Sequence, residues 1–179
     1  MPTRVTVATY LRGEETNQPR ELVYGFVREP PAPTYGHQAV VTNLGALLHR
    51  HVRRHRLGRV VVAPVDVVLD RKRALVLQPD LVFVSAERAG IVNDRVFGAP
   101  DLVVEVMSMG TAARDRTQKL EWYRQYGVRE CWLVDPFDRS VEVRALSASG
   151  ADVRRFEDGE CVRSVVLPRL RLAVRPLFD

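Results

Sequence analysis

The stretch Gln78–Ser85, QPDLVFVS, recurs with small changes as APDLVVEVMS at Ala99–Ser108. Each copy begins with a Pro-Asp pair and continues as an apolar run rich in valine, a pattern typical of a buried β-strand. The second copy differs because Glu105 interrupts its apolar run. A buried carboxylate without a partner is costly, so the strand pattern predicts that Glu105 has one.

The two strands also predict which carboxylates lie together. Asp101 and Glu105 are on one face of the same strand, but four residues at ~3.3 Å each put their Cα atoms roughly 13 Å apart, too far to share a metal ion. Asp80 begins the first strand, and Glu105 lies near the end of the second. Antiparallel pairing therefore predicts that Asp80 lies beside Glu105, with Asp101 at the far end of the sheet.

Two carboxylates side by side repel each other unless a proton or a cation lies between them. The hard divalent cations Mg²⁺ and Mn²⁺ suit oxygen ligands of this kind, so Asp80 and Glu105 are candidate metal ligands. An ion pair between Glu105 and an arginine or a lysine is the alternative. Asp101 follows Pro100 at a strand entry, where aspartate is an ordinary turn residue, and we expect its role to be structural.

Lys72 and Lys119 are the lysines of a chain in which lysine and arginine together number 27. In a helix, the spacing of Asp115, Lys119 and Tyr123 places them on one side. An Asp115–Lys119 salt bridge, worth roughly 0.3–0.5 kcal/mol, is one interpretation of this spacing. The scarcity of lysine and the short distance in sequence between Lys119 and Glu105 favour a different interpretation, in which Lys119 takes part in catalysis. A compact amine there could orient an attacking water or stabilise charge on a phosphorus.

The rest of the chain predicts the elements around these strands. A helix is expected from His37 to Gly58 and another from Thr111 to Gly127. Strands are expected at 20–29, 59–70, 77–85, 100–108 and 130–135, and antiparallel strands at 140–146, 153–158 and 165–174. This order predicts an α/β fold, a mixed sheet flanked by helices with additional antiparallel strands at the C-terminus. We expect one domain over residues 1–179, in which residues 1–19 are a loosely attached arm or first helix.

Composition excludes several classes of protein. The N-terminus has no signal-peptide pattern and no apolar run approaches roughly 20 residues, so we expect a cytoplasmic protein without a membrane partner. Cys131 and Cys161 are far apart in sequence and away from histidines, which argues against a zinc site. The net charge of +5 is compatible with nucleic acid but does not establish it. There is no glycine-rich phosphate loop and no nucleophile elbow.

Basic side chains gather at the expected end of the first long helix, in HRHVRRHR at His49–Arg56. Cations are favoured at a helix C-terminus, so a solvated basic face is the simplest interpretation. Arg50, Arg53 and Arg54 are the candidates here for contact with a phosphate backbone. His51 and His55 have the spacing of metal ligands on a helix but lack the glutamate of a zinc protease motif.

Five stretches together resemble the Uma-two family of restriction endonucleases, a branch of the PD-(D/E)XK nuclease superfamily. They are RELVYG, GHQAVVTNLGALL, QPDLVFVS, GAPDLVVEVMS and RDRTQKLEWYRQYGVRECWLVDP. The resemblance runs from about Arg20 to the C-terminal strands. It implies a restriction-endonuclease-like fold and metal-dependent hydrolysis of phosphodiester bonds.

The resemblance also assigns roles to residues. It implies that Asp80 and Glu105 bind the metal ion, with the backbone carbonyl of Val106 as a further ligand. The superfamily pattern has a lysine two residues after the glutamate, where this chain has Met107, and the family pattern carries its lysine in the next helix, at Lys119.

Two further residues match family positions. Glu21 is either an additional metal ligand or a residue that holds the first helix. His37 is expected to cap or anchor the start of a helix.

Two functions of different classes follow. The first is a Mg²⁺- or Mn²⁺-dependent endonuclease that cuts DNA, with Asp80, Glu105 and Lys119 as catalytic residues and possible assembly as a homodimer. The second is a nuclease fold that no longer cuts and serves as a binding or regulatory module, which the apolar Met107 favours. A glycosidase acid/base pair is a weaker third interpretation, because an aromatic content of 7% offers little for a sugar cleft.

Overall fold

The computed structural model describes residues 3–13, 16–108 and 112–179, without the side chains of residues 112–116. The helices are α1 (Val7–Leu11), α2 (Tyr35–His55) and α3 (Ala112–Tyr126), with 3₁₀ turns η1 (Ala86–Ile91) and η2 (Arg175–Leu177). The strands are β1 (Glu21–Val23), β2 (Phe26–Arg28), β3 (Gly58–Val62), β4 (Val67–Asp70), β5 (Leu75–Leu77), β6 (Leu81–Ser85), β7 (Val96–Phe97), β8 (Leu102–Val106), β9 (Glu130–Asp135), β10 (Ser140–Ser147), β11 (Gly150–Phe156), β12 (Cys161–Val162) and β13 (Leu172–Ala173).

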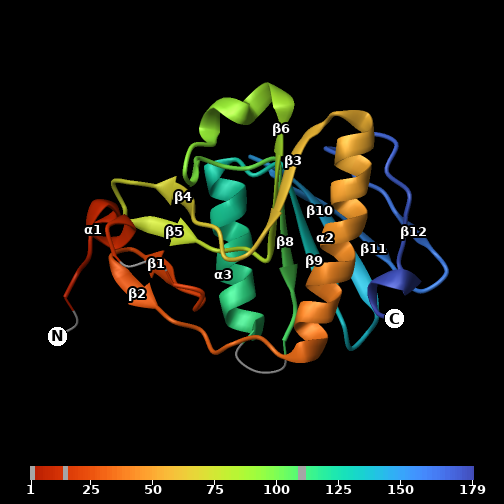
Figure 1. Ribbon diagram of the computed structural model, residues 1–179, viewed down its shortest axis with the longest axis horizontal. Coiled ribbons are helices and arrows are strands. Elements are labelled where there is room, and N and C mark those ends of the chain that lie inside the picture. The colour runs from red at the N-terminus through yellow and green to blue at the C-terminus, as the bar shows by residue number, and fades with distance from the viewer. Residues whose placement is uncertain (1–2, 14–15, 109–111) are drawn as a thin grey trace.

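The central sheet has six strands in the order β11-β10-β9-β8-β6-β3. Its β8–β9 pair is parallel and its other pairs are antiparallel, so the sheet is mixed, as the sequence predicts. Side chains alternate along β8 because successive residues of a strand point to opposite faces. Leu102 and Val104 pack with α2, whereas Val103 packs with α3. The two long helices therefore cover opposite faces of this sheet (Figure 1).

A second sheet of five strands has the order β2-β1-β5-β4-β7. One face, through Val23 and Leu75, packs against α3, and the other, through Leu22 and Val76, packs against α1. Helix α3 therefore lies between two sheets and contributes to the core on both sides. This position limits how far its side chains can move relative to the strands.

Residues 1–19 were expected to be a loosely attached arm or a first helix, and the described residues contain a helix, α1. Helix α1 is packed onto the second sheet, and its Val7 and Tyr10 side chains are only 5% and 4% exposed. Five helical residues with two buried positions are too short a pattern to be recognised as amphipathic from sequence.

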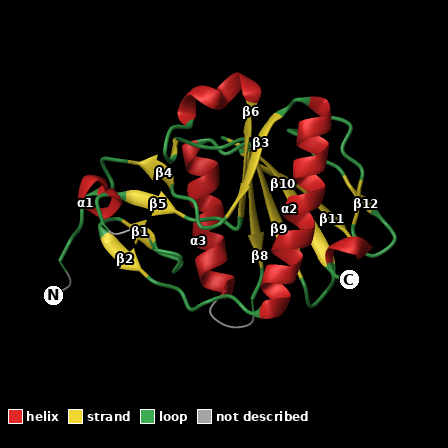
Figure 2. Cartoon of the chain, in the orientation of Figure 1, coloured by secondary structure: helices red, strands yellow, loops and turns green. Residues whose placement is uncertain are grey.

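Three of the predicted strands are each divided in the structure (Figure 2). The strand expected at 20–29 is the hairpin β1–β2, which turns at Tyr24 and Gly25, both with positive φ. The strand at 59–70 is split around Pro64 into β3 and β4, which belong to different sheets. The strand at 77–85 is likewise split at Pro79 into β5 and β6. Proline has no N–H for a sheet ladder, which explains both of these breaks.

The boundaries of the other elements differ less from those predicted from the sequence. Helix α2 ends at His55, with Arg56 in the left-handed conformation, rather than at Gly58. The expected loop through residues 93 and 94 is preceded by η1 and followed by β7. At the C-terminus the antiparallel pair β10–β11 is confirmed, but only residues 172–173 of the strand expected at 165–174 are extended. Among the described residues, no helix is long and apolar enough to cross a membrane.

Gly58 is expected to be intolerant of any side chain. Its φ is +145°, and a Cβ there would lie 2.1 Å from the carbonyl oxygen of Val84. Gly150 provides a matched control, because its φ is +148° but nothing lies within 4 Å of its Cβ position. We expect Gly58→Ala to lower the free energy of unfolding by about 3 kcal/mol and Gly150→Ala by about 1 kcal/mol in urea titrations. Equal losses in the two variants would contradict the steric part of this prediction.

Candidate active site

The predicted antiparallel pairing of the two Pro-Asp strands is confirmed. Leu81 of β6 is paired with Val104 of β8, which brings the preceding Asp80 next to Glu105. The backbone N–H of Val106 donates to Asp80 Oδ2 at 2.7 Å and fixes the position of that carboxylate. The side-by-side arrangement of Asp80 and Glu105 therefore follows from the register of one strand pair.

Helix α3 brings a lysine and a tyrosine to the second carboxylate. Lys119 Nζ lies 3.3 Å from Glu105 Oε1, and the Tyr123 hydroxyl donates to the same oxygen at 2.5 Å. Lys119 and Tyr123 are four residues apart, so they share one face of the helix. The Lys119 side chain retains 19% exposure and that of Glu105 18%, whereas Tyr123 is fully buried. Tyr123 therefore forms the floor of the site and Lys119 lies nearer to solvent.

Glu21 enters the same cluster from β1. Its Oε1 lies 2.7 Å from Lys119 Nζ and accepts a hydrogen bond from the backbone N–H of Gln78 at 3.2 Å. Lys119 thus bridges Glu21 and Glu105, which belong to different sheets. The partners of Glu21 are on α3 and next to β5. These contacts do not support the alternative in which Glu21 holds the first helix.

Burial and the excess of negative charge together shift the pKa values of the side chains in this cluster. Burial raises the pKa of Glu105 to about 7, with the charges of Asp80 and Glu21 acting in the same direction and that of Lys119 opposing them. Burial lowers the pKa of Lys119, but Glu105 and Glu21 more than compensate and raise it above its ordinary value. Burial also raises the pKa of Tyr123 well above its ordinary value. The amine therefore remains a cation and the phenol remains a hydrogen-bond donor.

His37 anchors the start of α2 to this cluster. Its Nε2 lies 3.3 Å from Asp80 Oδ2, and its side chain is 9% exposed. Burial lowers the pKa of His37, but the hydrogen bond and charge of Asp80, with the carbonyl of Val106, raise it above its ordinary value. The helix is capped by the hydroxyl of Thr34, which accepts from the His37 N–H. Of the two expected roles, His37 anchors the helix and Thr34 caps it.

Asp101 is at the opposite end of β8 and is fully buried. Its carboxylate accepts from the Ser85 N–H at 2.8 Å and from Arg129 and Arg88 at 3.1 and 3.3 Å. Burial raises the pKa of Asp101, but these hydrogen bonds and charges together lower it below its ordinary value. In the part of the chain that the structure describes, none of these partners of Asp101 contacts Asp80, Glu105 or Lys119. This agrees with the structural role expected for Asp101.

Replacing Asp101 by asparagine should destabilise the fold. The variant leaves two arginines facing a neutral amide, and we expect the free energy of unfolding at pH 7 to fall by about 3 kcal/mol. Because the pKa of Asp101 is depressed in the folded state, its contribution is present above pH ~4 and disappears as the pH falls through its folded pKa. Urea titrations should therefore show the deficit at pH 7 and a smaller one at pH 3. Asp152→Asn, at an exposed pair with Arg154, is the control and should change stability little.

The remaining candidates are outside the cluster or outside the described residues. The side chain of Asp115, and with it the predicted salt bridge to Lys119, lies outside the described residues. Arg50, Arg53 and Arg54 are exposed in the last two turns of α2, whereas His37 is in its first turn. At 1.5 Å per residue, Arg54 is roughly 26 Å along the helix from His37. The basic end of α2 and the carboxylates are therefore two separate parts of the surface.

Sequence reasoning missed two supporting residues. Gln78 holds Glu21 through its backbone, and its side chain donates to Asp66 at 2.8 Å. Tyr123 was expected only to share one side of a helix with Lys119, and its hydrogen bond to Glu105 was not foreseen. Its i+4 spacing from the lysine was the available signal, whereas nothing near Gln78 indicated a contact 57 residues away in sequence.

The donor set suits a hard divalent cation, although no metal is part of the structure. Glu21, Asp80 and Glu105 supply three carboxylates against the single charge of Lys119, and carboxylate and carbonyl oxygens are the ligands that Mg²⁺ and Mn²⁺ prefer. Val106 can add its backbone carbonyl. Among the residues that the structure describes, however, no three side chains of His, Cys, Asp or Glu are already arranged as a metal site. Lys119 and Tyr123 both contact Oε1 of Glu105.

Comparison with known families gives this geometry a context. Residues 7–175 match the Uma2 family, whose description is "Putative restriction endonuclease". The chain belongs to the Uma2 family. The Uma2 description places the protein, at a coarse level, among the nucleases.

A solved structure described as "a putative nuclease belonging to DUF820", from Anabaena variabilis ATCC 29413, has the same fold as this Uma2 chain. The TM-score is 0.80, the identity is 19%, and 97% of each chain is covered. At this identity the similarity establishes the fold alone, and it confirms the predicted fold class. A comparison with curated proteins found no match.

Proposed function

We propose that this protein is a metal-dependent endonuclease that hydrolyses phosphodiester bonds in DNA, with Asp80, Glu105 and Lys119 as catalytic residues. The observation that carries the proposal is the position of Lys119. The superfamily lysine would stand at Met107, two residues after Glu105 and just beyond the end of β8. Lys119 reaches Glu105 from α3, 14 residues further along the chain, with its Nζ 3.3 Å from Oε1. This contact supports Lys119 in the role of the superfamily lysine.

A bound Mg²⁺ or Mn²⁺ would supply a water of lowered pKa and neutralise charge on the phosphate. Asp80, Glu105 and the Val106 carbonyl are the residues that would hold the metal. The Val106 N–H and His37 keep Asp80 oriented, and Tyr123 keeps Glu105 oriented. Lys119, as a cation, would then hold the attacking water or stabilise the charge that develops on the phosphorus oxygens.

A binding module without catalysis is the second candidate, and one observation favours it. Lys119 already bridges Glu21 and Glu105 at 2.7 and 3.3 Å, so these two carboxylates have a cationic partner without a metal ion. In this case the cluster would be a buried ion-pair network that connects the two sheets. The predicted homodimer is tied to the first candidate, because cutting both strands of a duplex calls for two such sites.

The proposal is tested by incubating the purified chain with supercoiled plasmid in Mn²⁺, Mg²⁺ or EDTA, and by measuring Mn²⁺ affinity by calorimetry. We expect nicking with either metal and none in EDTA. Asp80→Asn should weaken Mn²⁺ binding by tenfold or more, on the order of what loss of a charged ligand costs. Glu142→Gln, at an ion pair with Arg144 outside the site, is the control. Unchanged Mn²⁺ affinity in Asp80→Asn would exclude this metal site.

A further inference from the structure

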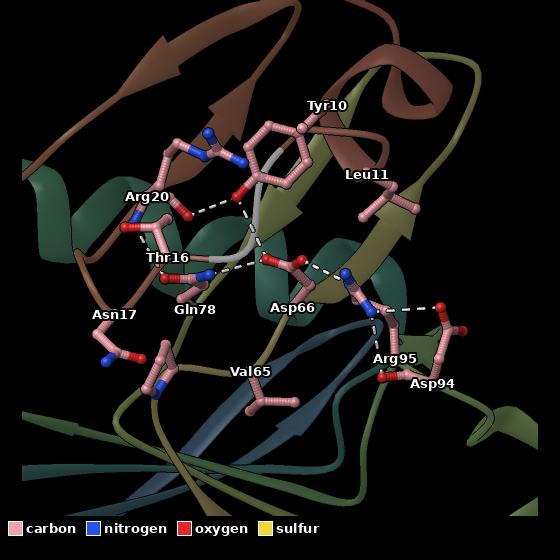
Figure 3. Close-up of a pocket in the computed structure, with 12 residues that line it drawn as sticks. Tyr10, Leu11, Thr16, Asn17, Arg20, Val65, Asp66, Gln78, Asp94 and Arg95 are labelled. Carbon is pink, nitrogen blue, oxygen red and sulfur yellow. Dashed lines mark hydrogen bonds and ion pairs between the residues drawn. The ribbon is translucent and has the colours of Figure 1, made fainter.

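A polar cavity of about 490 Å³ lies between α1 and the segments that lead into β1, β4 and β6 (Figure 3). Its volume is within the range of pockets that hold small organic groups. Tyr10, Arg20, Asp66, Gln78 and Arg95 contribute polar side chains to its lining.

The polar lining is held in place by a chain of hydrogen bonds. The Tyr10 hydroxyl donates to the Arg20 carbonyl at 2.6 Å and to Asp66 Oδ1 at 3.2 Å. Gln78 Nε2 and Arg95 Nε donate to the two oxygens of Asp66 at 2.8 and 2.9 Å. A network of this kind limits side-chain movement, so the cavity wall is preorganised rather than formed by surface side chains that happen to be near one another.

The cavity shares backbone with the candidate active site. Arg20 lines the cavity and the next residue, Glu21, contacts Lys119. Gln78 contacts both sides, since its side-chain Oε1 accepts from the Arg20 N–H at 2.9 Å and its own N–H donates to Glu21. Asp80 is two residues from Gln78, at most about 7 Å along the chain. A nucleotide bound in the cavity would therefore belong to the same stretch of strand as a phosphate at Asp80.

The charges of the lining favour a neutral polar occupant over a phosphate. Arg20 and Arg95 are balanced by Asp66 and Asp94, and Arg95 forms ion pairs with both aspartates, at 2.9 and 3.2 Å. The Arg20 guanidinium lies over the Tyr10 ring, 4.8 Å from its centre. Little positive charge is left for an anion, while donors and acceptors remain for a neutral ring.

Two groups of the lining lack partners within the structure. Arg20 Nε is buried and makes no hydrogen bond among the described residues. The exposed side chain of Asn17, which also lines the cavity, takes part in none of the hydrogen bonds between described residues. An amide that both donates and accepts is suited to the edge of a nucleobase, as in asparagine–adenine pairs.

We propose that this cavity takes one unpaired nucleobase of the strand whose phosphate lies at Asp80 and Glu105. The inference rests on the proposed function and defines its substrate class as DNA with an unpaired nucleotide at the cleavage position, such as a single strand or a bulged duplex. Enzymes that act next to a base reached by unstacking have to bind it in a pocket of this kind.

The cavity is tested first without metal or cleavage. Deoxyadenosine is titrated into ¹⁵N-labelled full-length protein in EDTA, and the side-chain amide signals of Asn17 and Gln78 are followed by NMR. We expect saturable shifts of both signals. Asn17→Leu should weaken binding about tenfold, the loss of one bidentate base contact, and Asn93→Ala, an exposed asparagine outside the cavity lining, should leave it unchanged. Absence of shifts, or equal shifts with inorganic phosphate, would overturn the base site.

The substrate class is tested by fluorescence anisotropy with labelled oligonucleotides of the same sequence, in Ca²⁺ to suppress cleavage. We expect a single strand and a one-nucleotide bulge to bind about tenfold more tightly than the paired duplex, and Asn17→Leu to abolish this preference. Equal affinities in the wild type would overturn the inference while leaving plasmid nicking intact. Deoxyadenosine binding without any nicking would instead refute the proposed function, so the two failures are distinguishable.

Discussion

Glu105→Gln should abolish metal-dependent DNA cleavage while leaving the protein folded. Glutamine keeps the volume of the side chain and one oxygen that can accept from Tyr123, so the contacts of the floor of the site are retained. The substitution removes one of the two negative charges that Asp80 and Glu105 would offer to a divalent cation. We expect the rate of plasmid nicking in Mn²⁺ to fall by about 10³-fold, as for loss of a metal ligand and the electrostatic stabilisation it provides.

The matched control for this variant is Glu121→Gln. Glu121 is also a glutamate in an ion pair with a basic residue, Arg124, but it is on the exposed face of α3. Its removal should change neither nicking nor the thermal midpoint appreciably. Thermal unfolding of Glu105→Gln by circular dichroism verifies that the variant is folded. Nicking at the wild-type rate by a folded Glu105→Gln would place the chemistry elsewhere on the molecule.

Lys119→Met should lower the nicking rate by about 10²-fold with little effect on Mn²⁺ affinity, because the lysine acts on the reacting phosphate rather than as a ligand. Methionine preserves most of the apolar stem that packs at the edge of α3. It removes the cation that lies between Glu21 and Glu105, so some loss of stability accompanies the loss of activity.

Two further variants separate catalysis from structure. Lys119→Arg retains the charge and should restore most of the stability, but the planar guanidinium is a poor replacement for a compact amine and activity should remain low. Lys72→Met changes the other lysine of the chain, in an exposed turn between β4 and β5, and should be silent. Full nicking activity in Lys119→Met would exclude Lys119 as a catalytic residue.

The central sheet was predictable because its signals are local. Alternating valines and the repeated Pro-Asp pair mark β6 and β8, and the position of Asp80 at a strand start against Glu105 at a strand end is sufficient to predict their antiparallel contact. The smaller sheet was not predictable in this way. Its strands have two to four residues, and its pairs form between segments separated by up to 54 positions, such as Leu22 and Val76. Patterns of that length carry too little periodicity.

The site was predictable to a similar extent. Asp80, Glu105 and Lys119 could be proposed because each is an unusual residue in its local pattern. The contacts of Lys119 with Glu21, and of His37 with Asp80, depend on how helices and sheets pack, and sequence spacing contains no information about that. Gln78 is the clearest case, since its role is carried largely by its backbone N–H, which every residue except proline possesses.

For the DNA substrate proposed above, the length of helix α2 sets the shortest duplex that can contact both ends of this helix. The first turn contacts Asp80 through His37, and the exposed arginines lie in the last two turns. A separation of roughly 26 Å corresponds to about seven or eight base pairs at 3.4 Å per step. A shorter duplex could contact the carboxylates or the arginines, but not both. Affinity should therefore rise with duplex length and level off at about eight base pairs.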